Sequence, residues 1–214
     1  MSFLSELQAY SHPKLRHTTT RVTNFLGQIH RESKSEDGTF QISDRSTDSN
    51  GIFMIIDNSP DEKLHYVIDG VYIGSQDSAV NRAALNEFKI THIANVATGI
   101  RNAFPEQYEY LNIELLDTPE TNIRNVFART NEFIQQAIDN NGRVLIHCNA
   151  GISRSSSIVL AYLLEIHRMK YEDAYELLKK ARSNIRPNDG FAKQLKEYAA
   201  EIAQRTENQP STAS

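Results

Sequence analysis

His147-Cys148-Asn149-Ala150-Gly151-Ile152-Ser153-Arg154-Ser155 is the stretch that decides the fold, because a short polar loop here joins an apolar run to a helical pattern. The run before the loop, Arg143 to His147, is rich in β-branched residues and follows the stop signal Asn140-Asn141-Gly142, which predicts a buried strand. From Ser155 to Ile166 the chain is apolar on nearly every side, which predicts a helix buried in a core. The sequence therefore predicts a strand, a tight loop and a helix N-terminus in succession.

This succession of elements predicts a binding site for a phosphate group. The unpaired N–H groups of a helix's first turn and of a glycine-containing loop point into one concavity, where the helix dipole also favours negative charge. Arg154 adds a planar guanidinium that can hold two phosphate oxygens at once. We expect a phosphate-binding loop made of Asn149, Ala150, Gly151, Ile152, Ser153 and Arg154.

Cys148 is the only cysteine of the chain and lies six residues before Arg154. A helix N-terminus and a nearby arginine stabilise a thiolate relative to the thiol, and a thiolate is a nucleophile at neutral pH. The alternative is that Cys148 is a small buried hydrophobe, as free cysteines often are. The fixed spacing to His147, Gly151 and Ser153 favours the nucleophile.

A second strand, Tyr110 to Leu115, is followed by a helical pattern that runs from about Asn122 to Gly142. Strands that a helical crossover joins in one sheet are normally parallel, so the residues that follow them lie at one sheet edge, where open α/β sheets bind ligands. Asp117 follows this strand as Cys148 follows the later one. We therefore expect Asp117 to face Cys148 and to act as a general acid, the alternative being a solvated turn former.

The motif His147-Cys148-x-Ala150-Gly151-x-Ser153-Arg154-Ser155 resembles the signature of the Cys-based dual-specificity protein phosphatases. The resemblance covers roughly residues 64 to 204. Within the family the chain most resembles the small atypical phosphatase that regulates the stress-activated JNK pathway. The further matches are Arg21-Val22-Thr23, Tyr72-Ile73-Gly74-Ser75, Asn102-Ala103-Phe104, Leu116-Asp117-Thr118-Pro119-Glu120-Thr121-Asn122 and Pro187-Asn188-Asp189-Gly190-Phe191.

The resemblance implies an α/β fold with a central, mostly parallel twisted sheet of about five strands flanked by helices. It implies hydrolysis of phosphotyrosine and of phosphoserine or phosphothreonine through a cysteinyl-phosphate, with phosphoproteins of a MAP kinase (JNK) pathway as substrates. Ser155 is then expected to donate a hydrogen bond toward the cysteine sulfur, and Asn188 to brace the phosphate loop. His147 either tunes the thiolate or is a core histidine.

Two other functions stay open at this point. The first is a phosphoprotein-binding scaffold of a kinase cascade with little catalysis, although Cys148, Arg154 and Asp117 are all present. The second is a phosphoinositide or RNA 5′-phosphate phosphatase, which the uncharged loop residues disfavour. Arg182 and Arg186 either attract a second phosphate or are solvated surface residues.

Composition agrees with an enzyme of the cytoplasm, with the nucleus as a second possible compartment. A net charge of −4 argues against nucleic-acid and anionic-membrane partners, and a single cysteine is expected in a reducing compartment. The seven histidines are scattered, so neither a metal nor another cofactor is expected. Oligomeric state is left open.

The sequence predicts three segments along the chain. Residues 1–62 read as an N-terminal arm and a flexible polar linker, the mobile part running from 31 to 60, because that stretch buries too little apolar surface to offset its ordering entropy. An apolar patch at 52–56 within it is either an edge strand or a partner-binding segment. Residues 63–205 are expected to form the catalytic domain, and residues 206–214 a disordered polar tail.

Overall fold

The computed structural model describes residues 20–23, 29–34, 40–46 and 60–207, which belong to two compact units, residues 1–58 and 59–214. The first unit contains an antiparallel sheet in the order β1-β2-β3. Its strands are β1 (Thr20–Thr23), β2 (Ile29–Lys34) and β3 (Phe40–Ser46).

Strand β3 and most of β2 lie within residues 31–60, the stretch that the sequence predicts to be a mobile linker. Phe40 and Ile42 alternate with polar neighbours, the period-two pattern of a strand, and backbone pairing between strands satisfies their N–H and C=O groups. The apolar patch at 52–56 lies outside the described residues.

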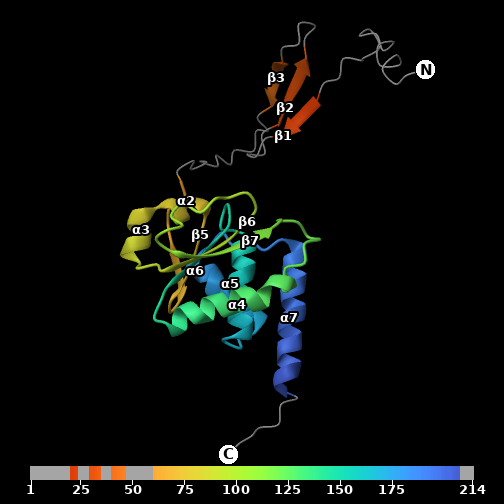
Figure 1. Ribbon diagram of the computed structural model, residues 1–214. Helices are drawn as coiled ribbons and strands as arrows, with labels where there is room; N and C mark the ends of the chain where they lie inside the picture. Colours follow the sequence, from red (N-terminus) through yellow and green to blue (C-terminus); the bar gives the residue numbers. More distant parts are fainter. Residues whose placement is uncertain (1–19, 24–28, 35–39, 47–59, 208–214) are drawn as a thin grey trace, which may run out of the picture. The chain divides into compact units, whose positions relative to one another are not determined.

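The second unit is built on a five-stranded sheet in the order β4-β5-β8-β6-β7 (Figure 1). The first two strands form an antiparallel hairpin joined by a turn at Asp69-Gly70, and the remaining neighbours are parallel. This arrangement confirms the predicted mostly parallel sheet. The strands are β4 (His65–Ile68), β5 (Val71–Gly74), β6 (His92–Ala97), β7 (Glu109–Leu115) and β8 (Val144–His147).

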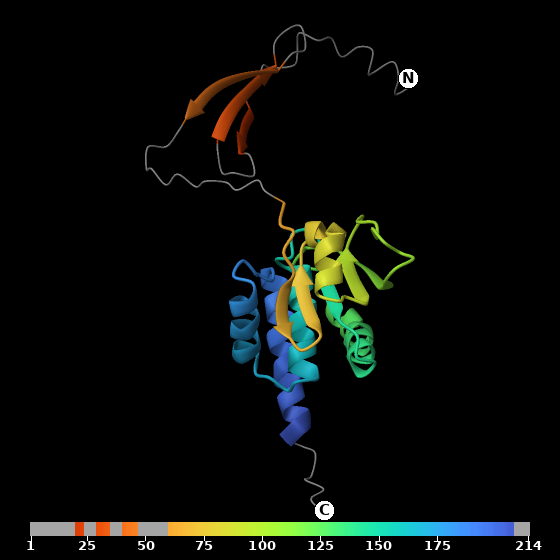
Figure 2. The ribbon, with the colours of Figure 1, turned by 90° about the vertical axis from the view of Figure 1, so that its left-hand side faces the viewer.

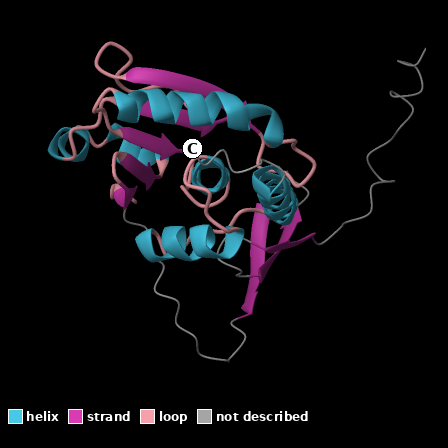
Figure 3. Ribbon diagram, turned by 90° about the horizontal axis from the view of Figure 1, so that it is seen from below, coloured by secondary structure: helices cyan, strands magenta, loops and turns pink. Residues whose placement is uncertain are grey.

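Helices cover the strands on more than one side, as Figure 3 shows in cyan and magenta. Helices α4 to α7 gather on one side of the sheet, and α2 and α3 lie apart from them (Figure 2). None of the described helices is both long and apolar enough to cross a membrane. The helices are α2 (Gln76–Val80), α3 (Arg82–Glu87), α4 (Arg124–Asp139), α5 (Arg154–Glu165), α6 (Tyr171–Ala181) and α7 (Asp189–Glu207).

Two of these helices correct the boundaries expected from the sequence. The sequence alone favours one helix from residue 79 to 88, but the structure has two, α2 and α3, divided at Asn81. The Asn81 backbone leaves the helical region at ψ 85°, and its side-chain oxygen caps α3 by accepting from the N–H of Ala84. Helix α7 continues to Glu207, into the expected polar tail. The sequence from 208 onward lies outside the described residues.

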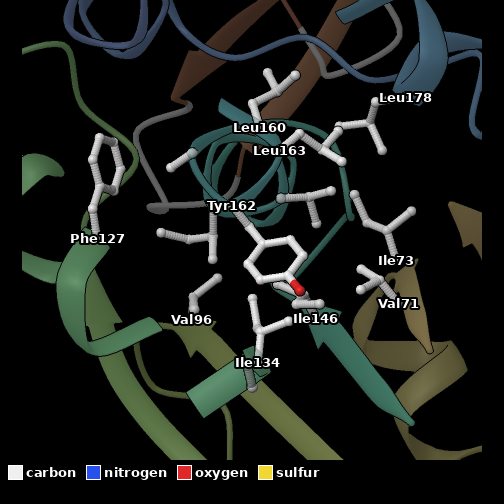
Figure 4. Packing of buried hydrophobic residues seen from close by; sticks show 14 of the residues in the cluster. Val71, Ile73, Val96, Phe127, Ile134, Ile146, Leu160, Tyr162, Leu163 and Leu178 are labelled. Atoms are coloured by element: carbon white, nitrogen blue, oxygen red, sulfur yellow. The ribbon is translucent and has the colours of Figure 1, made fainter. Parts of the chain in front are cut away.

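Helix α5 is the centre of the core, with every residue from Ser155 to Leu164 buried. Its side chains pack against β8 and α4, and Figure 4 shows the ring of Tyr162 reaching toward Ile146 and Ile134. The Tyr162 hydroxyl donates to Gln135 Oε1 at 2.9 Å, so burial leaves that hydroxyl paired. Strand β8 is covered on both faces, since Ile146 belongs to this cluster and Leu145 to a second cluster with Tyr72 and Leu85.

The parallel strands direct several loops to one edge of the sheet. Strands β5, β8, β6 and β7 run in the same direction, so the residues that follow each of them lie at the same edge. Cys148 follows β8, which lies inside the sheet between β5 and β6, and Asp117 follows β7. The fold thus gives the two residues a common edge, as the crossover argument expects.

Candidate active site

Cys148 lies between the end of β8 and the first turn of α5. Its Sγ is 3.4 Å from the hydroxyl of Ser155, which is fully buried in that turn. The residue is 1% exposed and its thiol is free. The sulfur therefore lies beneath the loop, with Ser155 as its hydrogen-bonding partner, and the expected contact between the two is present.

The loop from residue 149 to 152 turns its carbonyl groups outward. Four consecutive carbonyl oxygens each accept a hydrogen bond from a donor outside the loop. Because the C=O and the following N–H of a planar peptide point in opposite directions, the N–H groups of residues 150 to 153 are left for the inner side of the loop. The donors are Gln76 N to Asn149 O (2.9 Å), Arg182 Nη2 to Ala150 O (2.8 Å), Arg182 Nε to Gly151 O (2.9 Å), and both Arg186 N (2.9 Å) and Ser156 Oγ (2.6 Å) to Ile152 O.

Gly151 is required for this turn by its conformation and by its neighbours. Its φ is +68°, in the left-handed region that favours glycine. A Cβ at this position would lie 2.5 Å from the carbonyl oxygen of Gly74 at the end of β5. The loop can therefore approach β5 this closely only because residue 151 has no side chain.

Arg154 extends across the loop from the first position of α5. Its Nη2 donates to Asn149 Oδ1 at 2.8 Å and its Nη1 to the carbonyl of Leu115 at 3.2 Å. Its Nε is buried without a hydrogen-bond partner among the described residues and lies 3.5 Å from Asp117 Oδ2. The guanidinium thus joins the loop to the end of β7, and it carries a donor that an anion could occupy.

Asp117 is held beside the loop by two hydrogen bonds. Its Oδ1 accepts from the hydroxyl of Ser153 at 2.6 Å and from Nδ2 of Asn188 at 2.9 Å. Its side chain is 36% exposed, so it faces both the loop and solvent. The structure therefore brings Asp117 to the side of the loop that carries Arg154.

Asn188 connects three parts of the site. Its backbone N–H donates to Ser153 Oγ at 3.1 Å, and its side-chain oxygen accepts from the N–H of Phe191 in the first turn of α7. Together with the bond to Asp117, these contacts tie the start of α7 to the loop. The predicted bracing role of Asn188 is consistent with this geometry.

His147 is a core histidine, one of the two interpretations left open by the sequence. It is 2% exposed, and its Nδ1 lies 3.3 Å from the carbonyl oxygen of Cys148. Burial lowers the pKa of His147 to about 4, which the hydrogen bond to the Cys148 carbonyl only partly opposes. The imidazole is therefore neutral at pH 7 and supplies no positive charge next to the thiol.

Arg182 differs from both interpretations offered by the sequence. The residue is 2% exposed and donates to the loop from behind, so it is neither a solvated arginine nor free to bind a second phosphate. Arg186, in contrast, is exposed. The missed signal is a spacing of four residues, because Ala174, Leu178 and Arg182 continue the buried side of α6 by one turn.

The described residues contain no cluster of three or more histidine, cysteine, aspartate or glutamate side chains that could hold a metal ion. The groups that the site brings together are a thiol, a carboxyl group, a guanidinium and backbone N–H groups. Such a set suits a tetrahedral oxyanion and its transfer to sulfur.

Comparisons of sequence and of structure with known proteins find relatives of the same kind. Residues 71–201 match the model of the dual specificity phosphatase catalytic domain. The chain is 36% identical to mouse dual specificity protein phosphatase 19 over 92% of this chain and 90% of that protein. Among solved structures it is similar to the human tyrosine phosphatase-like serine/threonine/tyrosine-interacting protein (36% identity, TM-score 0.63, 65% and 97% of the two chains) and to DUSP15 (31%, 0.62, 70% and 98%).

Proposed function

This chain belongs to the dual specificity phosphatase family, and from that premise we propose how its residues hydrolyse a phosphate ester. The enzyme is a dual-specificity protein phosphatase, a phosphoric monoester hydrolase. The observation that supports the proposal is the convergence of Cys148, Arg154 and Asp117 at one sheet edge, where Asp117 accepts from the Ser153 hydroxyl of the loop and lies 3.5 Å from Arg154 Nε.

In the first step the Cys148 thiolate attacks the phosphorus of the substrate. The S–P bond forms as the bond to the ester oxygen breaks, and Asp117 donates its proton to that oxygen. Arg154 gives up its hydrogen bonds to Asn149 and Leu115 and donates instead to two phosphate oxygens. The N–H groups of the loop bind the other phosphate oxygens.

In the second step water attacks the cysteinyl-phosphate. Asp117, now a carboxylate, accepts a proton from that water, the S–P bond breaks and inorganic phosphate leaves. Ser155, whose hydroxyl lies 3.4 Å from the sulfur, donates to the departing thiolate and stabilises it. Ser153 and Asn188 keep the Asp117 side chain in place through both steps.

The substrates that we propose are phosphoproteins of a MAP kinase pathway, in particular its stress-activated JNK branch. The support is the family membership together with the subfamily resemblance at Arg21-Val22-Thr23 and Asn102-Ala103-Phe104. We place the activity in the cytoplasm, with the nucleus as the second compartment, where a free catalytic thiol stays reduced.

Leaving-group chemistry tests the roles of Cys148 and Asp117 separately. Cys148→Ser is expected to abolish hydrolysis of aryl phosphates. Asp117→Asn is expected to slow phenyl phosphate by about 10² to 10⁴, the usual contribution of acid catalysis, and p-nitrophenyl phosphate much less, since p-nitrophenolate leaves without a proton. Steady-state kinetics on both esters measures this. Equal losses on the two esters would contradict the acid role, and activity in Cys148→Ser would contradict the covalent route.

The second candidate function is phosphoprotein binding without turnover. It is favoured by the similarity to the serine/threonine/tyrosine-interacting protein, whose structure is described as tyrosine phosphatase-like. Two results together support catalysis on these substrates: the Asp117→Ala variant captures phosphorylated kinases of the JNK pathway, and the unaltered enzyme dephosphorylates them. If the unaltered enzyme captures these kinases and leaves their phosphate in place, the scaffold function is supported. If neither protein captures these kinases, the pathway assignment is overturned.

A further inference from the structure

Arg182 is a charged side chain buried behind the phosphate-binding loop. It follows the last residue of α6, and its guanidinium contacts two segments far from it in the sequence. Nε donates to Gly151 O at 2.9 Å, and Nη2 donates to Ala150 O at 2.8 Å. Nη2 also contacts the carboxylate of Asp61, 121 positions earlier in the chain.

A buried guanidinium costs free energy unless its charge and its donors are satisfied. Here the Asp61 carboxylate balances the charge, and two loop carbonyls accept from the fork. Arg182 therefore binds two of the four loop carbonyls that point outward. A lysine has no planar fork with which to reach both carbonyls in fixed geometry.

Asp61 is itself held in place by the neighbouring helix. Its backbone N–H donates to Asp77 Oδ2 at 3.1 Å, and its carbonyl oxygen accepts from the hydroxyl of Ser75 at 2.7 Å. Ser75 caps α2, and the N–H of Gln76 in the same turn donates to Asn149 O. The residue that pairs with Arg182 is thus fixed by the same turn that supports the start of the loop.

We propose that Arg182 is a positioning residue for catalysis, which keeps the N–H groups of the loop directed at the phosphate, and that Asp61 holds its guanidinium in that orientation. The inference rests on the proposed function, because it concerns the geometry of the same loop. Arg182 does not touch the substrate. It acts through the carbonyls of Ala150 and Gly151, on the outer side of the loop.

Selective alkylation of the cysteine gives a readout of this geometry, because the chain has one cysteine. Iodoacetate and iodoacetamide both alkylate a thiolate with release of iodide, but only iodoacetate carries the anionic group that the loop binds. The ratio of their rate constants at Cys148 therefore reports how well the N–H groups are oriented. Because a cysteine in unfolded protein reacts with both reagents at the ratio of a free thiol, the rates are measured only on protein that circular dichroism shows to be folded.

The test compares Arg182→Met, Arg182→Lys and Asp61→Asn in the full chain. Lys180→Met is the matched control, because it removes a charge from the same turn of α6 at an exposed position. We measure tungstate affinity by calorimetry, kcat and KM on p-nitrophenyl phosphate, and the alkylation ratio. Arg182→Met is expected to lower kcat/KM and tungstate affinity by about 100-fold, the loss that a 1 Å displacement of catalytic groups can cause. It is also expected to lower the ratio of iodoacetate to iodoacetamide alkylation.

Arg182→Lys and Asp61→Asn are expected to give smaller losses in the same three quantities, while Lys180→Met keeps the values of the unaltered enzyme. An unchanged ratio and tungstate affinity in the Arg182 and Asp61 variants would overturn the positioning role. If Arg182→Met does not fold, the other two variants decide the question. Failure of the unaltered enzyme to bind tungstate or to hydrolyse the ester would instead contradict the proposed function.

Discussion

His147 precedes the nucleophile, yet its imidazole is unsuited to assist it as a cation. Burial lowers the pKa to about 4, since an imidazolium so far from water would lose its hydration. Its Nδ1 is engaged by the carbonyl of Cys148. The side chain that contacts the Cys148 sulfur is instead Ser155, whose hydroxyl lies 3.4 Å away.

This shift makes the stability of the protein depend on pH. An unfolded histidine titrates near pH 6.5 and the folded one near 4, so between these values the unfolded state binds more protons. The free energy of unfolding is expected to decrease as the pH falls from about 6.5 to about 4, by up to roughly 3 kcal/mol in total. Urea unfolding at pH 7, 6 and 5 measures the decrease, and His147→Asn should remove much of the slope. Parallel pH profiles of the two proteins would contradict the assignment.

At the scale of elements, the strand, loop and helix around Cys148 fit together because one residue has no side chain. Gly151 combines a left-handed backbone with close approach to the carbonyl of Gly74. Gly99 also has a positive φ, of +74°, but a Cβ there would meet nothing within 4 Å. The two glycines thus separate the effect of backbone conformation from the effect of crowding.

Substituting each glycine by alanine tests this difference. Gly99→Ala is expected to cost about 1 kcal/mol of stability from the strained φ, and to leave kcat/KM on an aryl phosphate unchanged. Gly151→Ala adds a clash with Gly74, so the loop must shift, and we expect a loss of activity of about 100-fold together with a larger loss of stability. Thermal unfolding and steady-state kinetics on both variants provide the comparison. Equal effects would show that backbone strain alone matters at position 151.

The sequence was sufficient for most elements around the site. A continuous apolar run predicted β8 and α5, and helical periodicity predicted α4, each to within a few residues. Prediction from the sequence failed at Asn81, where a side-chain cap interrupts a continuous apolar pattern, and in β3, where a polar composition hid a period-two alternation. Both failures concern local backbone hydrogen bonds, which composition does not report.

At the scale of the whole molecule, the site is assembled from segments far apart in the chain. The parallel sheet and its crossover helix made the proximity of Asp117 and Cys148 predictable from the sequence. The contact between Asp61 and Arg182 was not predictable, since it depends on how α6 packs beside the entry to the domain. An arginine on the buried side of a helix indicates a partner but does not say which residue it is.

This assembly predicts where the catalytic domain can be cut. Among the described residues, the hydrogen-bond partners of Asp117, Arg154 and Arg182 all lie after residue 60, and the second compact unit begins at Ser59. A protein of residues 60–207 is therefore expected to keep the melting temperature of the second unit and the full kcat/KM on p-nitrophenyl phosphate.

A protein of residues 64–207 provides the matched control for this cut. It lacks only four more residues, but one of them is Asp61, so the charge of Arg182 loses its partner. We expect this shorter protein to lose tungstate affinity and to show a lower ratio of iodoacetate to iodoacetamide alkylation, in the same direction as Asp61→Asn. Calorimetric scanning, oxyanion titration and alkylation rates on both proteins measure these effects. Equal oxyanion affinity in the two proteins would show that the entry segment is only a tether, whereas loss of activity already at 60–207 would mean that residues before 60 contribute to catalysis.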